Sequence, residues 1–412
     1  MIFPSHKIST HHKHDKGRIF AWMALISSTG YASFLTMLPI ILSEKLQSDV
    51  YVGYYFSAFA IIALIVSLLS GKILKRFQKT TLTKYILAML AITFFALTLT
   101  KSIWNFAAID MMRVIFVSLF FIILSIFVRD FATEEELALA EGRFYLFSNI
   151  GWVIGPLVGG YAAKTYGPES AFIFTAICYA LLLVLFLQQH IIAKHPAISK
   201  KDENNAMPTP SIPIPKPIKN TGSLLENIKD YIQNRDLLVA SLVSFGMYFW
   251  WSTSSIYIPI ALKNLGFAPD IIGLIFALNV VPLILLEFHS SDGAQKYGVR
   301  TFLVMGFTIL STCLVLFTLV SVPMLIKLII IINIGSAFIE PIKEIFFFKV
   351  APPGDVDRFY GIYSASYPMA YVFAPLLGSL LLSSFGINGI WLGAAVVFIL
   401  IALTSLTIDK KY

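Results

Sequence analysis

The chain has 412 residues, of which 57% are hydrophobic and 13% are charged, and its formal net charge is +8. Soluble domains carry about 45–50% apolar and about 25% charged residues, so this composition excludes an ordinary soluble protein. The apolar residues also form runs of about 18–25 residues, which are long enough to cross a hydrocarbon core of about 30 Å.

Residues 1–18 are polar and rich in histidine, and we expect them to form a cytoplasmic tail. The apolar run that follows is longer than the core of about 7–15 residues in a cleavable signal, so it should remain as the first span. Histidine is a common metal ligand, but the tail has no cluster of cysteines or carboxylates beside it. We therefore predict neither a metal site nor a cofactor.

The apolar runs predict an all-α integral membrane protein, in which twelve transmembrane helices form two pseudo-symmetric six-helix bundles. The first bundle covers residues 19–192 and the second covers residues 237–408. The expected spans are 19–42, 51–71, 82–100, 104–128, 144–163, 171–192, 237–262, 271–288, 301–320, 324–348, 359–382 and 390–407.

Residues 193–236 are predicted to be a cytoplasmic linker that contains an amphipathic helix. Prolines at alternate positions within residues 207–219 favour an extended chain. Ser223 and Glu226 then match a capping box. Apolar residues on one helical face predict a short helix along the cytoplasmic membrane surface: Leu224, Leu225, Ile228, Tyr231 and Ile232.

The distribution of basic residues predicts the orientation in the membrane. With the N-terminus inside, 24 of the 31 Lys and Arg residues face the cytoplasm and 5 face outward, while Arg113 and Lys343 lie within spans. We therefore expect a multi-pass protein of the plasma (inner) membrane with both termini in the cytoplasm.

The two bundles share landmarks in one register, which predicts a duplicated six-span unit. Proline and glycine landmarks recur 219 or 220 residues apart. The matched segments are 38–40 with 258–260, 52–53 with 272–273, 71–78 with 291–298, and 155–159 with 374–378. Parallel halves of this kind place a substrate site near the midplane, between the halves.

At these residues the sequence resembles the major facilitator superfamily over essentially its whole length. The family pattern G-x-L-A-D-R-x-G-R-R/K after span two corresponds to residues 71–79, with an echo at 291–300. The resemblance assigns a cytoplasmic gate to Gly71, Lys75, Arg76, Gln295, Lys296, Gly298 and Arg300. Lys75 and Gln295 occupy the position of the acidic residue with which the family is thought to latch this gate, so the usual latch is not expected.

Two further motifs extend the resemblance. Arg113 stands where the family places an arginine in span four, but Phe116 and Val117 replace the neighbourhood that usually follows it. Span five matches in full a pattern of the family's proton-coupled exporters. Because small residues permit close helix contact and proline bends a helix, we expect a packed hinge at Gly151, Gly155, Pro156, Gly159 and Gly160.

Charged residues within spans are costly and tend to be functional. Asp110 lies roughly 10 Å below the outer surface at 1.5 Å per residue, and Arg113 follows on the same helical face. The pair is either a proton-coupling device or a fixed structural ion pair. Glu340 precedes a helix-breaking proline and is at helical spacing from Lys343, which makes it a second candidate for proton exchange.

The resemblance implies that spans one, four, seven and ten line the cavity. Its candidate lining residues are Tyr31, Tyr248, Trp251, Ser254, Ser255 and Asn333. Aromatic rings with scattered hydroxyls suit an amphipathic or aromatic substrate. The alternative is that the aromatic residues face lipid or form interfacial belts.

These features predict a monomeric secondary active transporter that works by alternating access. Its partners are then a small molecule, protons and the lipid bilayer, with no nucleic acid. Proton-coupled efflux of a hydrophobic or amphipathic compound is the first hypothesis. A proton-coupled uptake symporter for a sugar or organic acid, or a non-transporting sensor or scaffold, are the alternatives. The chain has no nucleotide-binding or hydrolase motif, so we do not expect an enzyme.

Overall fold

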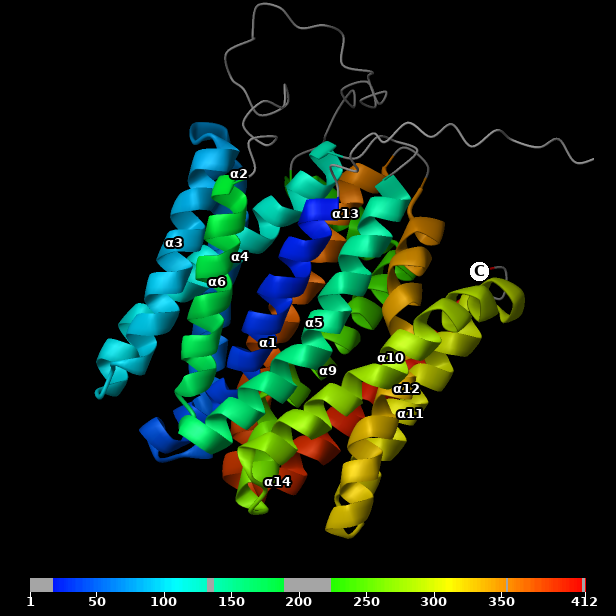
Figure 1. Cartoon of the computed structure of the whole chain (residues 1–412). Coiled ribbons are helices and arrows are strands. Elements are labelled where there is room, and N and C mark those ends of the chain that lie inside the picture. Colours follow the sequence, from blue (N-terminus) through cyan, green and yellow to red (C-terminus); the bar gives the residue numbers. More distant parts are fainter. Residues whose placement is uncertain (1–17, 132–136, 189–223, 353–354, 410–411) are drawn as a thin grey trace, which may run out of the picture.

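The computed structural model describes residues 18–131, 137–188, 224–352, 355–409 and 412, and the elements within them are α-helices (Figure 1). The predicted tail and the proline-rich part of the linker lie outside the described residues. The helices are α1 (Arg18–Leu46), α2 (Asp49–Arg76), α3 (Lys79–Thr98), α4 (Ile103–Phe131), α5 (Leu137–Tyr166), α6 (Ser170–Gln188), α8 (Leu224–Gln233), α9 (Arg235–Asn264), α10 (Pro269–Tyr297), α11 (Val299–Phe317), α12 (Val322–Val350), α13 (Val356–Ser364) and α14 (Ser366–Ser405).

Eleven helical segments of the described residues are long and apolar enough to cross a membrane, and the last of them, Arg358–Ser405, runs from α13 through α14 and covers two predicted spans. A straight helix over its 48 residues would be about 72 Å long, more than twice the hydrocarbon core. Gly386 interrupts α14 with a φ of 67°, a conformation that glycine adopts without steric cost. Counted on either side of Gly386, the helices give the twelve predicted spans.

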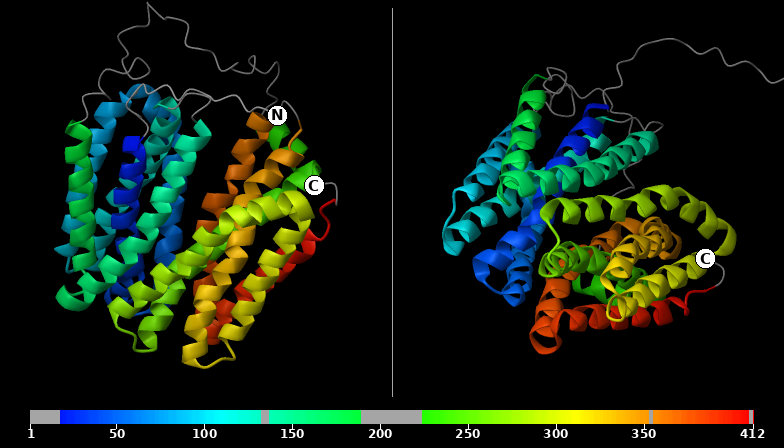
Figure 2. Two further views of the ribbon diagram at one scale, coloured as in Figure 1. Left: turned by 45° about the vertical axis from the view of Figure 1, so that its right-hand side comes forward. Right: turned by 60° about the horizontal axis from the view of Figure 1, so that its bottom comes forward.

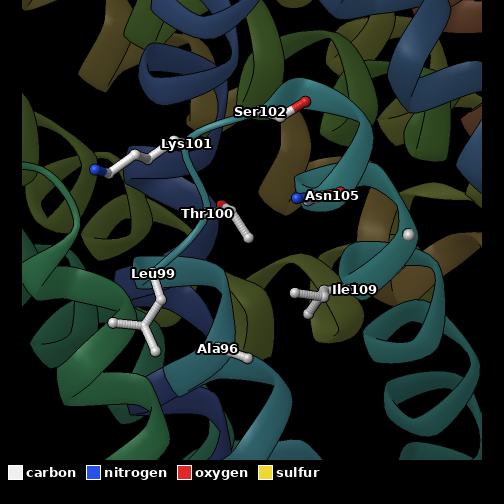
Figure 3. A pocket seen from close by; sticks show the side chains of 8 residues that line it. Ala96, Leu99, Thr100, Lys101, Ser102, Asn105 and Ile109 are labelled. Carbon is white, nitrogen blue, oxygen red and sulfur yellow. The ribbon is translucent and has the colours of Figure 1, made fainter.

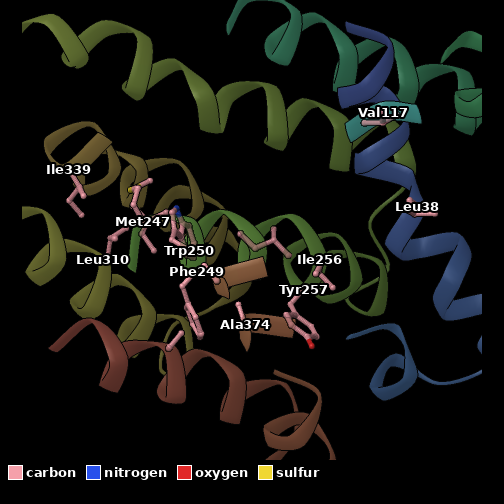
Figure 4. Close-up of a cluster of buried hydrophobic side chains, with 14 of the residues drawn as sticks. Leu38, Val117, Met247, Phe249, Trp250, Ile256, Tyr257, Leu310, Ile339 and Ala374 are labelled. Carbon is pink, nitrogen blue, oxygen red and sulfur yellow. The ribbon is translucent and has the colours of Figure 1, made fainter. Parts of the chain in front are cut away.

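The halves lie side by side, with α1–α6 on one side and α9–α14 on the other in both views of Figure 2. The core of the second half is built around Trp250 on α9, which is fully buried. Figure 4 shows Met247, Phe249 and Trp250 among apolar residues of neighbouring helices. Both lipid and core favour apolar residues here, so most spans are apolar on every face.

The segments predicted to be gate loops are in fact the ends of helices. Polar stretches continue α2 and α10 beyond their apolar spans, and the gate residues on them are Gly71, Lys75, Arg76, Gln295 and Lys296. Lys and Arg in a last helical turn interact favourably with the helix dipole, which explains why these helices continue. Gly298, with a φ of 88°, ends α10, and Arg300 lies in the first turn of α11.

The predicted amphipathic helix in the linker is present as α8, and it docks on the second half. The buried hydroxyl of Tyr231 donates a hydrogen bond of 3.0 Å to the carbonyl of Leu237, and this burial raises the pKa of Tyr231 to about 12. Arg358 of α13 forms an ion pair with Asp230. Ile232, in contrast, is exposed. The helix therefore belongs structurally to the second bundle.

The glycines of the span-five motif form the surface on which α5 packs against α1. A Cβ at Gly151 would lie 2.7 Å from the carbonyl oxygen of Leu25, and one at Gly155 would lie 2.8 Å from the Cβ of Ala32. No side chain fits at these distances, so the two backbones are in direct contact. The motif is thus a packing surface within the first half.

The same motif also contributes to the contact between the halves, where α5 crosses α10 (Figure 1). A Cβ on Gly160 would lie 3.1 Å from the Cα of Gly273, and one on Gly273 would collide with the carbonyl oxygen of Pro156. The equivalent contact on the other side joins α2 to α14. There, a Cβ on Gly53 would lie 2.5 Å from the carbonyl oxygen of Pro375. The landmarks that align in the sequence repeat therefore meet each other across the two halves.

We call these two glycine–proline contacts, α5 with α10 and α2 with α14, the seams. Hydroxyl groups reinforce the seam between α2 and α14. Ser379 donates a hydrogen bond of 2.7 Å to the carbonyl of Val50, and Ser57 donates one of 2.8 Å to that of Val372. The hydroxyl of Tyr257 on α9 donates a hydrogen bond of 2.8 Å to the carbonyl of Pro375, so it is part of the polar contacts at this seam.

Ion pairs join the halves where α1, α5 and α9 end, which we call the far face. Lys164 pairs with Asp270 at 2.6 Å, and Glu44 pairs with Lys263 at 3.1 Å. Asn264 also donates to Asp49 at 2.8 Å. Between residues that the structure describes, the hydrogen bonds and ion pairs that link the halves lie along the α2–α14 seam or at this face. The structure is therefore closed at the far face.

The seams predict that Gly273→Val destabilises the protein, because its side chain must separate α10 from the carbonyl of Pro156. We expect a cost of about 1–3 kcal/mol, as for other overpacked sites. Gly71→Val is the matched control, since a Cβ at Gly71 meets no atom within 4 Å. Thermal unfolding of the two purified variants measures the difference, and equal effects would contradict the seam.

Candidate substrate and coupling site

The first charge centre lies in α4, where Arg113 forms an ion pair with Asp110. The two are three residues apart and so share one helical face. Their side chains are only 6% and 1% exposed, respectively. The hydroxyl of Tyr55 on α2 donates a hydrogen bond of 2.8 Å to the second carboxylate oxygen of Asp110. A charge this deeply buried needs such partners, and here both carboxylate oxygens have one.

Aromatic rings cover the cation of the same pair. The guanidinium carbon of Arg113 lies 4.6 Å from the ring centroid of Phe34 and 6.0 Å from that of Phe94. Both distances fall within the range of cation–π attraction. The centre is therefore an internally neutral pair sealed by rings, and a proton reaching Asp110 requires these neighbours to move.

The second charge centre lies in α12, where Lys343 forms an ion pair with Glu340. The indole N–H of Trp251 on α9 donates to Glu340 at 3.1 Å. The ammonium of Lys343 lies 5.0 Å from the ring centroid of Tyr248. The exposure is uneven, because the Glu340 side chain is 25% exposed and that of Lys343 only 3%. The accessible member of this pair is the carboxylate.

The two centres differ in depth as well as in exposure. Asp110 is the eighth residue of α4 and Glu340 is the nineteenth of α12. These helices are equivalent in the repeat, so the difference of eleven residues corresponds to about 16 Å along the helix axes. Asp110 lies nearer the far face and Glu340 nearer the opposite end.

A group of tyrosines lies between the centres. The ring of Tyr248 meets that of Tyr367 edge-to-face at 4.9 Å, and Tyr367 lies 4.9 Å from Tyr371. Tyr31 of α1, in the first half, lies near Arg113 and near both tyrosines of α14. Tyr367 is 49% exposed although protein surrounds it, as expected for a side chain that faces internal space. The tyrosines therefore connect the halves at mid-depth.

Other candidate cavity residues have different surroundings. Ser254 and Ser255 donate back to carbonyls of their own helix, at 3.2 and 3.1 Å. Asn333 is fully buried. Its side-chain oxygen accepts from Trp250 at 3.0 Å, and its amide donates to the carbonyl of Asn279 at 2.7 Å. The structure thus brings Tyr31, Tyr248 and Trp251 toward the charge centres but not Asn333.

Sequence reasoning missed Tyr55, Tyr367 and Tyr371. It restricted the cavity to spans one, four, seven and ten, whereas these tyrosines lie on α2 and α14. Their signal in the sequence is weak, because a tyrosine in a span is as common at the lipid interface as in a cavity.

A pocket of about 640 Å³ lies elsewhere, at the connection between α3 and α4 (Figure 3). Its lining is mainly apolar and includes Leu99, Thr100, Lys101 and Ile109. No residue of either charge centre lines it, so we assign it no part in the site.

Two related six-helix halves, each with a charge centre inside its spans, define a secondary transporter, which carries substrates rather than transforming them. The family model of the Major Facilitator Superfamily matches residues 20–260 and 238–411. The chain therefore belongs to the Major Facilitator Superfamily and is a multi-pass membrane transporter.

Three similar proteins fit this assignment. The uncharacterized MFS-type transporter YqjV of Bacillus subtilis (strain 168) is 23% identical over 375 residues, covering 90% of this chain and 85% of that protein. Multidrug resistance protein 1 of the same organism is 22% identical over 360 residues, covering 86% and 87%. The crystal structure of the nucleoside transporter NupG has a TM-score of 0.72 at 13% identity, covering 95% and 98%. This last likeness concerns the fold alone.

The buried pair of α4 predicts a large cost for removing one partner. Arg113→Met leaves Asp110 buried without its cation and should destabilise the protein by about 3–5 kcal/mol. Adding Asp110→Asn should recover part of that loss. Thermal unfolding in detergent, followed by tryptophan fluorescence, compares the two variants.

Lys79→Met is the control for this comparison, because the pair of Lys79 with Asp130 is partly exposed, at 29% and 26%. Its loss should cost no more than about 1 kcal/mol. An Arg113→Met variant as stable as Lys79→Met would show that the α4 pair is not held in a buried site.

Proposed function

We propose that the chain is a proton-coupled exporter of hydrophobic or amphipathic small molecules that works by alternating access in the plasma (inner) membrane. The observation that carries this proposal is the presence of two charge centres inside the spans, one sealed and one accessible. Ionisable groups in such positions are costly and are typical of proton and substrate pathways. A non-transporting scaffold has no evident need for them.

The geometry supports different roles for the two charge centres. With the far face closed, Asp110 is sealed while the carboxylate of Glu340 is accessible. If the seams and the far-face ion pairs separated, Asp110 would become accessible from the far face. A proton bound there cancels the charge of Asp110 and frees Arg113 from its partner. The unpaired cation is unstable in place, and this drives the halves toward the other arrangement.

The basic-residue distribution favours a cytoplasmic location for both termini, so that the far face is the outer one. The direction of transport is inferred as export from two observations. The span-five motif is complete, and one relative is named Multidrug resistance protein 1. Proton-coupled uptake remains the alternative, and the sign of proton movement distinguishes the two.

The test uses purified protein in liposomes that contain a pH-sensitive dye, with no gradient imposed. Lipophilic cations, neutral amphipathic compounds, sugars and organic acids are added outside one at a time. Export by antiport predicts that a transported compound makes the interior alkaline, whereas symport makes it acidic. Asp110→Asn and Glu340→Gln should each abolish the signal. Asp130→Asn, at a partly exposed acidic residue near the end of α4, should retain it.

Acidification of the interior would replace export by uptake. Silence across the panel, together with no direct uptake of any compound, would favour the non-transporting alternative. A signal that survives in both Asp110→Asn and Glu340→Gln would remove these carboxylates from the coupling mechanism.

A further inference from the structure

The ammonium of Lys343 occupies a site that has the chemistry of a cation-binding site. It contacts the carboxylate of Glu340 and lies 3.3 Å from the carbonyl oxygen of the same residue. The ring of Tyr248 lies 5.0 Å away. A carboxylate combined with an aromatic face is how proteins bind organic cations. Here the bound cation belongs to the chain itself.

This region carries more negative than positive charge. Glu344 lies one helical turn beyond Glu340 and on the same face of α12. It interacts electrostatically with both Lys343 and Glu340. Glu287 of α10 does the same. Three acidic side chains and one ammonium therefore share this region, and a further monovalent cation brings their charges closer to balance.

The charges that approach from the first half do not change this balance. Arg129 at the end of α4 pairs with Glu141 of α5 at 3.2 Å. These two lie near Tyr145 and Tyr360, which flank the region. Their opposite charges cancel, so the surplus of negative charge in the second half remains.

The accessible part of this region is acidic and aromatic. The carboxylate of Glu340 and the ring of Tyr367 are accessible, whereas Lys343 is almost fully buried behind them. The buried Tyr363 lies near Glu344 and Tyr248.

We propose that this charge centre binds a monovalent organic cation with aromatic or apolar groups, and that Lys343 is a tethered competitor which the substrate displaces from Glu340. This inference rests on the proposed transport function and specifies its substrate. When the cation leaves, Lys343 returns to Glu340, so the carboxylate is never left unpaired in a low dielectric. Tyr248 and Trp251 then hold the substrate by its apolar part.

If Lys343 competes with the substrate for Glu340, then removing Lys343 and removing Glu340 should change cation binding in opposite directions. Purified protein is dialysed to equilibrium against radiolabelled tetraphenylphosphonium, with tetraphenylborate as an anion of similar shape. Lys343→Gln removes the competitor and should tighten tetraphenylphosphonium binding by about tenfold, whereas Glu340→Gln should weaken it at least about tenfold. Lys327→Gln, near the start of the same helix, should leave binding unchanged.

Two further variants keep the test decisive should Lys343→Gln fail to fold, which size-exclusion chromatography detects. Tyr248→Phe keeps the aromatic face and should bind tetraphenylphosphonium normally, whereas Tyr248→Leu should weaken binding. Weaker binding in Lys343→Gln, equal binding of both ions, or no effect of Tyr248→Leu would overturn the proposal. Dialysis measures binding independently of proton movement. If any of these results is found while the protein still exports a neutral compound in exchange for protons, only the cation site is refuted and the proposed transport function stands.

Discussion

The structure depends on one constraint, namely that hydrocarbon offers no partner to a polar group, so each charge in a span must be satisfied by the protein. Asp110 meets this requirement with Arg113 and Tyr55, under the rings of Phe34 and Phe94. Glu340 meets it with Lys343 and Trp251.

These partners come from several helices, so the charges fix how α1, α2, α3 and α4 pack in one half and how α9 and α12 pack in the other. Any change in protonation or binding at either centre therefore acts on helix packing. This link between charge and packing is what makes a small chemical event able to move whole helices.

The contacts between the halves have a different character from the packing within them. The seams join glycines to the carbonyls of prolines within helices, and hydroxyl groups add hydrogen bonds to the seam between α2 and α14. The far-face ion pairs that accompany them are partly exposed to solvent. Exposed pairs contribute little stability each. The far face is thus closed by contacts that can separate without disrupting either core.

Sequence alone predicted the spans, the duplicated halves and the spacing of Asp110 and Arg113, because these depend on length, register and helical periodicity. It did not predict which residues face one another between helices. Asn333 was assigned to the cavity but bonds to Trp250 and Asn279, and Tyr55 was overlooked. A helix that is apolar on every face has no amphipathic pattern to show its orientation, so tertiary packing decides it.

The ends of helices were the other feature that sequence predicted poorly. Hydropathy marks where the lipid ends, and the gate segments were therefore expected to be loops. Helix formation does not stop at that point, because the basic residues near Arg76 and Lys296 are compatible with a helix C-terminus. In contrast, Gly386 alone separates two spans, since its positive φ turns the chain within one residue.

The central claim is that the halves alternate between opposite closed faces. It is tested most directly by measuring the distances between pairs of spin labels on the protein in nanodiscs, after Cys178 and Cys313 are replaced by alanine. One spin-label pair at Tyr166 and Leu265 reports the far face, and a second at Tyr145 and Tyr360 reports the opposite end; all four side chains are exposed. As pH is lowered or a transported compound is added, the account predicts that the first distance lengthens while the second shortens. Distances that stay fixed, or that change in the same direction, would contradict it.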